Sequence, residues 1–336
     1  MSSSKKLLII RLSSAGDVLL SSPLLKIIKN AEAESEIHFV VKSQYADIIR
    51  YNPNVDKVHL VQDGASIHKL ENLHRELLGE SFHSTLDLQN NFRSVYLRKR
   101  TSENIRVINK EVVKRALLVK TKLNLFSTVR SVSLKYTQVY DESIKEVPRP
   151  EIYMPDEILK RTDQLWKTVG PGSGKVIVLC PGAKHFTKRW PVEYWIEIAK
   201  KFSGRNYVVL LGGEADKEIC SQIQRNADAI NFSGELSLIE STAMLTHADL
   251  VITNDSFLMH AANALGKNIV AIFGSTVKEF GFFPYGVNSK ILEVDKLSCR
   301  PCSHVGREKC PRGHFKCMLG TKPDAVYSAA VRLLEA

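Results

Sequence analysis

The stretch LLIIRLSSAGDVLLSSPLLKIIK, residues 7–29, decides the fold. It opens with the branched apolar run Leu7–Ile10, which is too short for a helix and predicts a buried strand. Small residues follow at 13–17, Ser-Ser-Ala-Gly-Asp, and allow a sharp turn of the backbone. Apolar residues then recur from Val18 to Ile28 in the pattern of a helix with one buried face. A strand, a turn and a helix in this order aim the helix N-terminus at a ligand.

Asp17 stands at the junction of this turn and this helix. A carboxylate in such a place commonly caps the helix, because it accepts hydrogen bonds from the free N–H groups. The carboxyl end of a first strand is also where open α/β sheets bind their ligands. Asp17 is therefore either a helix cap or a general base, and the residues alone leave both interpretations open.

The composition indicates a globular protein of two domains. The chain has 336 residues, of which 44% are hydrophobic, and this is too long for one ordinary core. No apolar run reaches the ~20 residues that span a bilayer, and the start MSSSKK does not resemble a signal peptide. We therefore expect a cytoplasmic protein. In that compartment the six cysteines argue against a disulfide framework.

The net charge of +11 is concentrated in one segment. Residues 93–135 hold twelve basic and two acidic residues, a surplus of ten. Such a surplus is typical of a solvated helix surface or of a face that meets an anion, and its concentration favours the anion. Nucleic acid, acidic lipid headgroups and a phosphorylated substrate all fit. Stacking on nucleic-acid bases needs interleaved aromatic residues, and Tyr96 and Phe126 are the only ones in this segment.

Strands and helices alternate along both halves of the chain, which predicts parallel sheets with helices on both faces. The expected strands lie at 7–10, 36–42, 56–61, 81–88, 105–108, 175–180, 207–211, 230–232, 250–253 and 268–273. Proline and glycine punctuate the region between the halves. We therefore place one domain at 1–150, a linker region with one helix at 151–173, and a second domain at 174–336 that includes a Cys-rich tail (299–317) and a terminal helix. Two such halves imply a cleft between the carboxyl ends of their sheets.

Three turns in the second half end strands with small or polar residues and suit a nucleotide diphosphate. They are PGAKHFTK (181–188), GGEAD (212–216) and NDSF (254–257). Ser256 and the N–H groups that open the helix at Phe257 can cradle a phosphate. Lys184 and Lys188 can neutralise it, since lysine is a good point charge for phosphate. Asp255 and Glu214 can accept hydrogen bonds from sugar hydroxyls.

The same residues also have structural interpretations. Asp255 and Ser256 suit a helix cap equally well, and His260 and Trp190 are typical of packing residues. The sequence contains no G-x-G-x-x-G and no Walker lysine motif, which argues against a Rossmann dehydrogenase or a P-loop NTPase.

Five segments together resemble glycosyltransferase family 9, and within it the ADP-heptose:lipopolysaccharide heptosyltransferases, the second-heptosyltransferase group in particular. They are RLSSAGDVLLSSP (11–23), DLQNNFRS (87–94), PGAKHFTKRWP (181–191), NDSFLMHAANALG (254–266) and CRPCSHVGREKCPRGHFKCM (299–318). Their order and spacing match as well, and the resemblance spans about residues 7–330.

The resemblance implies a GT-B fold, in which two Rossmann-like domains with parallel sheets face a central cleft. The N-terminal domain is expected to hold the acceptor and the C-terminal domain the sugar nucleotide. The implied activity is inverting and metal-independent transfer of a heptose from ADP-heptose to the inner core of lipopolysaccharide, without a cofactor. Asp17 matches the family's general base, which takes the proton of the acceptor hydroxyl. Lys188 matches the cation that stabilises the departing diphosphate.

Further site residues follow from the resemblance together with the turns described above. The expected donor-binding residues are Thr187, Lys184, Glu214, Asp255, Ser256, Phe257 and His260. The expected acceptor-binding residues are Ser14, Gly16, Gln89, Arg93 and Arg98. At Phe257 the sequence departs from the family, which commonly has glycine there.

The anionic inner core at the membrane surface gives the basic segment a target. We therefore expect peripheral association with the inner face of the inner membrane and no nucleic-acid partner. The alternatives are a family 9 transferase with another sugar nucleotide or acceptor, a GT-B sugar-nucleotide epimerase, a basic nucleic-acid-binding protein with a zinc element, and a degenerate transferase kept as a scaffold. An epimerase needs no basic acceptor face, and the presence of both Asp17 and Lys188 speaks against a scaffold.

The Cys-rich tail invites a zinc interpretation. Its first pair is a C-x-x-C, but its second pair is too widely spaced for a common zinc ribbon. We favour packed, free thiols and expect no metal. The candidate ligands are Cys299, Cys302, Cys310 and Cys317, with His304 and His314 interleaved. Nearby basic residues that suit an anion are Arg300, Arg307, Arg312 and Lys316.

Overall fold

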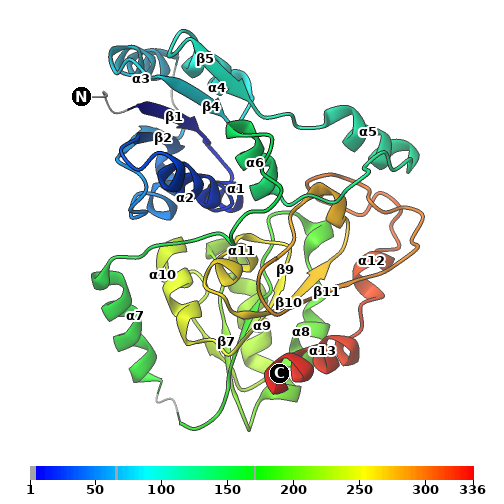
Figure 1. Cartoon of the computed structure of the whole chain (residues 1–336). Coiled ribbons are helices and arrows are strands. Elements are labelled where there is room, and N and C mark those ends of the chain that lie inside the picture. Colours follow the sequence, from blue (N-terminus) through cyan, green and yellow to red (C-terminus); the bar gives the residue numbers. More distant parts are fainter. Residues whose placement is uncertain (1–4, 65–66, 170–171) are drawn as a thin grey trace. The chain divides into compact units, whose positions relative to one another are not determined.

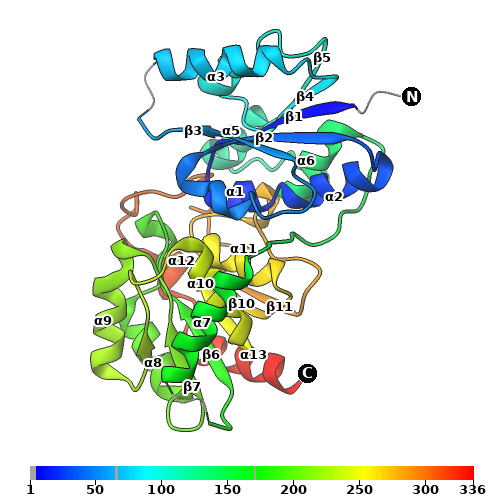
Figure 2. The ribbon, with the colours of Figure 1, turned by 90° about the vertical axis from the view of Figure 1, so that its left-hand side faces the viewer.

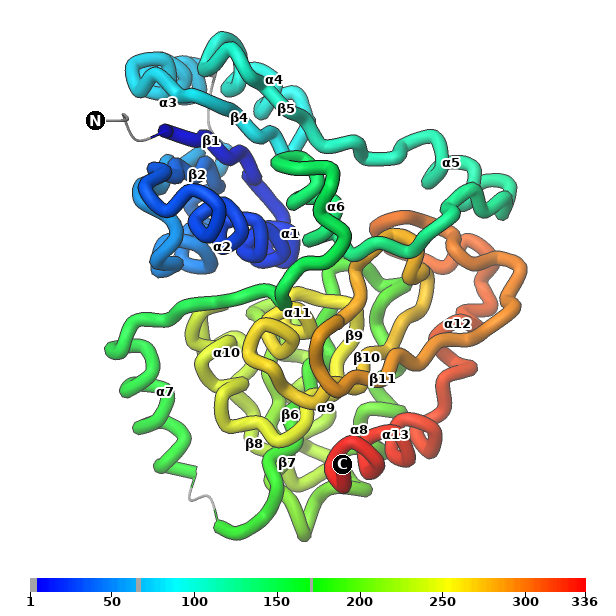
Figure 3. The backbone as a smooth tube through the Cα atoms, viewed as in Figure 1, coloured from blue at the N-terminus to red at the C-terminus, as the bar shows by residue number. Residues whose placement is uncertain are grey.

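The chain forms two compact units of α/β structure. The computed structural model describes residues 5–64, 67–169 and 172–336 (Figure 1). Unit 1 is formed by Met1–Lys110 and Ser131–Tyr153, and unit 2 by Glu111–Arg130 and Met154–Ala336. The chain therefore leaves unit 1, returns to it and leaves it again, a path that can be followed by colour in Figure 3.

Unit 1 is built on a parallel five-stranded sheet with the strand order β3-β2-β1-β4-β5. Its strands are β1 (Lys6–Ile10), β2 (Glu36–Lys42), β3 (Lys57–Val61), β4 (Ser84–Asp87) and β5 (Asn104–Val107). Its helices are α1 (Ala15–Leu19), α2 (Ser22–Ala31), α3 (Ile67–Gly79), α4 (Phe92–Arg98) and α6 (Val132–Tyr140), with a 3₁₀ helix at Ser43–Ile48. Figure 2 shows α3 on one side of this sheet and α1 and α2 on the other. The helix that we expected from residue 65 has its first two residues outside the described ranges.

The helix expected from Val18 to Ile28 is broken into α1 and α2. The break has a local cause, because Pro23 has no N–H to donate and favours the first turn of a new helix. The serine hydroxyls at the break donate to the last carbonyls of α1, Ser21 Oγ to Val18 O at 2.6 Å and Ser22 Oγ to Leu19 O at 2.8 Å. Asp17 consequently lies inside a helix of only five residues, at its third position.

Unit 2 has a parallel six-stranded sheet with the order β11-β10-β9-β6-β7-β8. The strands are β6 (Val176–Cys180), β7 (Tyr207–Leu210), β8 (Ile230–Asn231), β9 (Leu250–Asn254), β10 (Asn268–Phe273) and β11 (Ser289–Glu293). The helices are α5 (Val112–Thr121), α7 (Asp156–Thr168), α8 (Val192–Phe202), α9 (Lys217–Asn226), α10 (Leu238–Met244), α11 (Phe257–Ala264), α12 (Lys316–Leu319) and α13 (Pro323–Glu335). Strand β11 was not predicted. It pairs with β10 at one edge of the sheet and is only partly buried, so it lacks a clear apolar pattern.

The units differ from the expected domain ranges at two places. Segment Glu111–Arg130 lies in unit 2, although we expected it within 1–150. It is attached there by polar contacts, such as Lys122 Nζ to the Pro301 carbonyl oxygen at 2.6 Å and Asn124 Nδ2 to Glu279 Oε1 at 3.1 Å. Helix α7, which we expected in the linker, also lies in unit 2 and packs against α10.

Each unit has its own apolar core. In unit 2 the rings of Trp190 and Trp195 meet edge to face at 5.1 Å, and both side chains are buried. Trp190 Nε1 donates to the Thr321 carbonyl oxygen at 2.9 Å, which satisfies its one donor and confirms its expected packing role. Across the ranges that the structure describes, no helix is both long enough and apolar enough to cross a membrane.

Candidate active site

Both parallel sheets reverse their strand order at an equivalent place. In unit 1 the order runs outward from neighbouring strands β1 and β4, and in unit 2 it runs outward from β6 and β9. In open α/β sheets the crevice beside the carboxyl ends of such a strand pair is the usual ligand site. The expected site residues follow these four strands, with Asp17 after β1, Gln89 after β4, Lys188 after β6 and Asp255 after β9.

In unit 1 the loops after β1 and β4 are joined by Gln89. Its Oε1 accepts hydrogen bonds from the backbone N–H groups of Leu12 at 3.0 Å and Ser13 at 3.2 Å. Gln89 is itself buried, and its N–H donates to Asp87 Oδ1 at 2.9 Å. Gln89 therefore fixes the turn that leads into Asp17.

Asp17 is a helix cap and also the centre of a charged cluster. Its Oδ2 accepts from the backbone N–H of Ser14 at 3.2 Å and from Ser14 Oγ at 2.7 Å, as in a capping box. Its Oδ1 lies 2.6 Å from Arg11 Nη2 and accepts a hydrogen bond from the Tyr136 hydroxyl at 2.8 Å. The Arg11 guanidinium also lies over the Tyr136 ring, 5.1 Å from its centroid.

These contacts keep Asp17 ionised. Burial acts to raise the pKa of this carboxyl, since its side chain is only 14% exposed. The Arg11 guanidinium and the hydrogen bonds from Ser14 and Tyr136 outweigh burial and lower the pKa below its ordinary value. A charged, partly accessible carboxylate at the carboxyl end of β1 suits both interpretations of the sequence, because it caps α1 and is ready to accept a proton.

The expected acceptor residues fall into two groups. Ser14 and Arg93 are exposed and Gly16 is partly exposed, so they are available to a ligand. Arg98 is instead paired inside unit 1, where its Nη1 lies 2.7 Å from Oδ2 of the fully buried Asp87. Gln89 is likewise engaged in its own loop. Arg98 and Gln89 therefore stabilise the loops of unit 1, and their direct contact with an acceptor stays a prediction.

In unit 2 the central contact is an ion pair between Lys188 and Asp255. Lys188 Nζ lies 2.7 Å from Asp255 Oδ2, and the two side chains are 15% and 5% exposed. Thr276 Oγ1 donates to the same carboxylate oxygen at 2.8 Å. The loops after β6, β9 and β10 thus meet at one cation–anion pair.

The buried Asn254 holds two of these loops together. Its Nδ2 donates to the Pro181 carbonyl oxygen at 2.7 Å, and its Oδ1 accepts from the backbone N–H of Trp190 at 3.3 Å. The segment from 181 to 190, which carries Lys188, is therefore attached at both ends to the last residue of β9.

Thr187 is buried and serves the protein itself. Its hydroxyl donates to Ser275 Oγ at 2.9 Å and accepts from the backbone N–H of Arg307 at 2.8 Å. Its own N–H donates to the Arg307 carbonyl oxygen at 3.1 Å. The Cys-rich tail is thus bound to the loop that carries Lys188, and a direct contact of Thr187 with a donor stays a prediction.

The remaining expected donor-binding residues differ in how exposed their side chains are and in what they contact. Lys184 is exposed, and Glu214 is 77% exposed with Lys217 Nζ at 2.8 Å. Ser256 is the N-cap residue of α11, and Phe257, the first residue of this helix, is half-buried where the family commonly has glycine. His260 is buried, with its ring 6.3 Å from that of Phe282, which agrees with a packing role, and its contact with a donor stays a prediction.

The tail contains four free thiols and a structural arginine. Cys299, Cys302, Cys310 and Cys317 form no disulfide, and in the described ranges they do not bring three ligand atoms within 4.8 Å of one another. The Arg300 guanidinium, a candidate anion ligand, is instead buried among acceptors. It donates to the carbonyl oxygens of Gly274, Val294 and Thr276 and to Glu293 Oε2, at distances of 2.6–2.8 Å.

Sequence reasoning missed the residues that support the site. Arg11 and Asn254 had a signal, since each is a polar residue at or next to the carboxyl end of a buried strand. Tyr136 had none, and Arg300 was named only as an anion ligand, because their contacts with the site span more than 20 residues of sequence.

Comparison with known proteins assigns the family. The model of "Glycosyltransferase family 9 (heptosyltransferase)" matches residues 70–311, well over half of the chain. The chain belongs to glycosyltransferase family 9. The resemblance stated from the sequence motifs is thereby confirmed.

This family 9 protein has relatives among lipooligosaccharide heptosyltransferases. It is 33% identical to lipooligosaccharide heptosyltransferase 2 of Campylobacter jejuni serotype O:2 over 169 residues, which are 48% of this chain and 51% of that protein. The match thus spans about half the length of this relative.

Solved structures confirm the fold class. A family 9 glycosyl transferase from Veillonella parvula superimposes with a TM-score of 0.84 at 23% identity, covering 100% of this chain and 99% of that chain. The Escherichia coli ADP-heptose lps heptosyltransferase II gives a TM-score of 0.75 at 20% identity, with 98% of both chains covered. Two Rossmann-like units with parallel sheets, the GT-B class of fold, are as the sequence predicted.

Proposed function

We propose that this family 9 protein is an inverting glycosyltransferase that moves a heptose from ADP-heptose to the inner core of lipopolysaccharide without a metal ion. The observation that carries the proposal is that each sheet places a matched charged group at its ligand-binding edge. Unit 1 holds an ionised carboxylate at Asp17, and unit 2 holds an ammonium group at Lys188. Proton removal and stabilisation of a departing diphosphate need these two charges.

In the proposed chemistry, Asp17 is the base that deprotonates the acceptor hydroxyl. Its carboxylate takes the proton as the hydroxyl oxygen bonds to the anomeric carbon and the bond from that carbon to the diphosphate oxygen breaks. Arg11 and Tyr136 keep the carboxylate charged and hold its Oδ1, so it is oriented before substrate arrives. The low pKa of Asp17 makes it a weak base, so the acceptor proton is transferred late, as the new bond forms.

In the proposed chemistry, Lys188 stabilises the departing diphosphate. Negative charge grows on the diphosphate as the bond to the sugar breaks, and a fixed ammonium stabilises that charge without a metal ion. In the absence of a donor, Lys188 is neutralised by Asp255. The N–H groups that open α11 next to Ser256 are suited to the same phosphates.

The proposed acceptor is the anionic inner core at the inner face of the inner membrane, where the protein would bind peripherally. The exposed part of the basic segment supports this assignment, as do relatives named lipopolysaccharide and lipooligosaccharide heptosyltransferases. Some basic residues of this segment form ion pairs within the protein and are not free to bind an anion. Arg98 pairs with Asp87, and Arg130 Nη2 lies 3.0 Å from Glu111 Oε1.

A direct assay tests the function. The protein is incubated with ADP-heptose and a heptose-deficient lipopolysaccharide core, with and without EDTA, and the product is read by mass spectrometry. We expect one added heptose and equal yield in EDTA. Calorimetry with ADP, UDP, GDP and CMP tests the donor separately. Preferential binding of UDP or GDP would leave the family assignment unchanged but would show that the donor is not ADP-heptose.

Lys188→Ala tests the donor site. We expect ADP to bind about tenfold more weakly or worse and turnover to fall further, because the growing charge on the diphosphate loses its partner. Lys200→Ala, an exposed lysine of α8, is the matched control. An unchanged affinity for ADP would assign Lys188 to the ion pair with Asp255 alone.

A further inference from the structure

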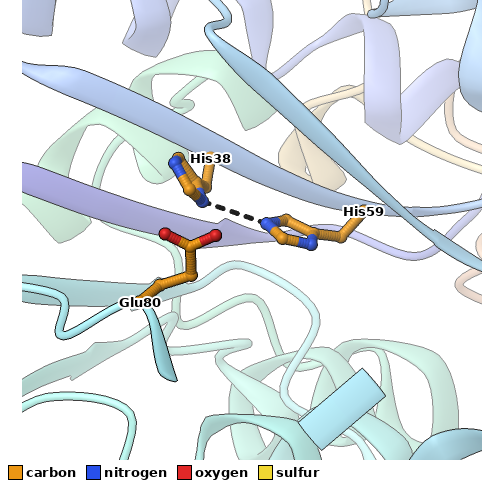
Figure 4. A group of neighbouring side chains, drawn as sticks. All are labelled: His38, His59 and Glu80. Carbon is orange, nitrogen blue, oxygen red and sulfur yellow. Dashed lines mark hydrogen bonds between the residues drawn. The ribbon is translucent and has the colours of Figure 1, made fainter. Parts of the chain in front are cut away.

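We propose that His38, His59 and Glu80 form a binding site for a divalent transition-metal ion in unit 1. Within the described ranges this is the one group of three His, Cys, Asp or Glu side chains whose ligand atoms all lie within 4.8 Å of one another (Figure 4). The site is separate from the proposed transfer chemistry and does not depend on it.

The sheet brings these residues together. In the parallel register, His38 of β2 is opposite Lys57 and His59 of β3 is opposite Val40, so the two histidines are diagonal neighbours on one face of the sheet. Glu80 is in the turn between α3 and β4. In Figure 4 its carboxylate faces the pair of imidazole rings.

Both histidines are buried. The side chain of His38 is 0% exposed and that of His59 is 1% exposed. The ring of Phe82 packs edge-on against the ring of His38, with the centroids 5.0 Å apart. Buried polar atoms need partners, so each ring nitrogen must be accounted for.

The outer nitrogens are accounted for by carboxylates. His38 Nε2 lies 2.7 Å from Glu36 Oε1, and His59 Nδ1 lies 2.9 Å from Glu76 Oε1. An ionised carboxylate only accepts hydrogen bonds, so both outer nitrogens carry the hydrogen of their ring. A neutral imidazole has a single N–H group. With both imidazoles neutral, the inner nitrogens, His38 Nδ1 and His59 Nε2, both present lone pairs, and a hydrogen bond between them requires one ring to carry a second proton.

These two inner nitrogens are only 3.0 Å apart. Two lone pairs at this distance repel each other unless a cation lies between or beside them, either a proton that makes the hydrogen bond drawn in Figure 4 or a metal ion. A tetrahedral metal ion with bonds of about 2.1 Å to nitrogen holds its ligand nitrogens roughly 3.4 Å apart, so a shift of a few tenths of an ångström admits it. Carboxylates on the outer nitrogens are the usual second contacts of metal-binding histidines.

Glu80 completes the set of ligands. Its Oε2 accepts from Lys6 Nζ at 2.9 Å and its Oε1 from Lys57 Nζ at 2.6 Å. A carboxylate has about four lone-pair positions, so the two ammonium groups leave room for an ion. The carboxylates of Glu36, Glu76 and Glu80 also outnumber the two ammonium groups, which leaves the cluster one negative charge in excess.

The donor set indicates the class of ion. Two imidazole nitrogens and one carboxylate oxygen suit Zn²⁺, Co²⁺, Ni²⁺ or Cu²⁺ rather than Mg²⁺ or Ca²⁺. The fourth position would be taken by water. Such an ion would tie β2, β3 and the turn before β4 to one another, away from the carboxyl edge of the sheet where Asp17 lies.

Metal titration of the whole chain tests the site. The protein is stripped with EDTA and dialysed, then titrated with Co²⁺ by visible absorption and with Zn²⁺ by calorimetry. We expect one ion with tetrahedral bands and no thiolate charge-transfer band, which separates this site from the tail cysteines. His38→Gln and His59→Gln should each lower the Zn²⁺ affinity by more than 100-fold. Loss of the outer partner in Glu76→Gln should cost about 10- to 100-fold.

Two controls keep the test decisive. His68→Gln replaces an 85% exposed histidine on α3 and should leave affinity unchanged. Glu76 is half-exposed, so Glu76→Gln is expected to fold even if a buried histidine variant does not. The proposal is overturned by thiolate bands from the bound ion, by equal affinity in Glu76→Gln and the control, or by no binding at all. The last result would mean that the two imidazoles share a proton instead.

Discussion

At the scale of single residues, the contacts of Asp17 are compatible with both of the tasks that the sequence presented as rivals. It accepts the capping hydrogen bonds of Ser14 with one oxygen and faces Arg11 and Tyr136 with the other. Capping and catalysis are compatible because a carboxylate has two oxygens and several lone pairs.

Asp17→Asn should therefore separate the two tasks. The amide oxygen can still accept from Ser14, but the side chain no longer takes a proton. We expect kcat to fall by about 10²- to 10⁴-fold with little change in ADP affinity. Asp47→Asn, a half-exposed aspartate of the 3₁₀ helix, is the control for charge removal in unit 1. Turnover close to that of the unchanged protein would remove Asp17 from the chemistry.

Tyr136→Phe tests the pKa of Asp17. The hydrogen bond from the Tyr136 hydroxyl is one of the contacts that lower this pKa, so its removal should raise it. Because Asp17 acts in its charged form, the acidic limb of kcat/KM should move to higher pH, with the rate near neutral pH changed severalfold at most. Stability follows the same sign. The Asp17 contacts contribute above the ordinary aspartate pKa of about 3.9 and are lost as pH falls through the lower folded value.

Charged residues at the carboxyl edges of the two sheets could be predicted from the sequence. The residues that position them through hydrogen bonds and ion pairs could not. Asp17, Lys188 and Asp255 could be predicted because each stands in a short polar turn after a buried strand. Arg11, Tyr136 and Thr276 act through contacts between segments distant in sequence, and no local pattern reports such contacts.

At the scale of elements, strands β1 to β10 were predictable because most of them are short apolar runs closed by polar or small residues. The break between α1 and α2 was not, since the apolar spacing continues through Ser21 and Pro23. Strand β11 was missed because its two apolar residues, Ile291 and Leu292, are adjacent instead of alternating, and none of its residues is buried. The conformational preferences of single residues decide where a helix ends or breaks, whereas the spacing of apolar residues indicates only which face of an element is buried.

Arg300 gives an element-scale prediction. Its guanidinium satisfies three carbonyl oxygens and Glu293, and one of those carbonyls belongs to Thr276, which holds Asp255. Arg300→Leu leaves these acceptors unpaired, and we expect it to lower the free energy of unfolding by about 3–5 kcal/mol. Arg312→Leu, an exposed arginine of the same tail, should have little effect. Chemical denaturation followed by tryptophan fluorescence gives both values, and equal values would exclude this supporting role.

At the scale of the whole molecule, the basic surplus of residues 93–135 is divided between the two units. Residues 93–110 and Lys135 are in unit 1, and residues 111–130 are in unit 2. In the latter, α5 combines lysines with the exposed apolar side chains of Val112 and Val113, which are 66% and 70% exposed. Basic and apolar side chains together are typical of segments that bind anionic membrane surfaces.

Vesicle binding tests this surface. We expect the protein to sediment with vesicles that contain anionic lipid, and less so as salt is raised. Lys114→Glu with Lys120→Glu should lower vesicle binding several-fold, and Val112→Ser with Val113→Ser should lower it without changing the salt dependence. Lys200→Glu on α8 is the control for charge. Equal sedimentation with neutral vesicles would refute an electrostatic association.

The contacts between Thr187 and Arg307 join residues 120 positions apart. They have a consequence for synthesis on the ribosome, where the chain emerges from its N-terminus. The loop that carries Lys188 is made long before the tail that supports it, and α13, which packs on β9 and β10, is made later than both. Unit 1 is formed only by segments that precede residue 154, so it can fold on the nascent chain before the rest of the chain is made. The proposed donor half is therefore completed only after Arg307 and α13 have been made, and a nascent chain stalled before them should hold a folded unit 1, the proposed acceptor half, without a working nucleotide site.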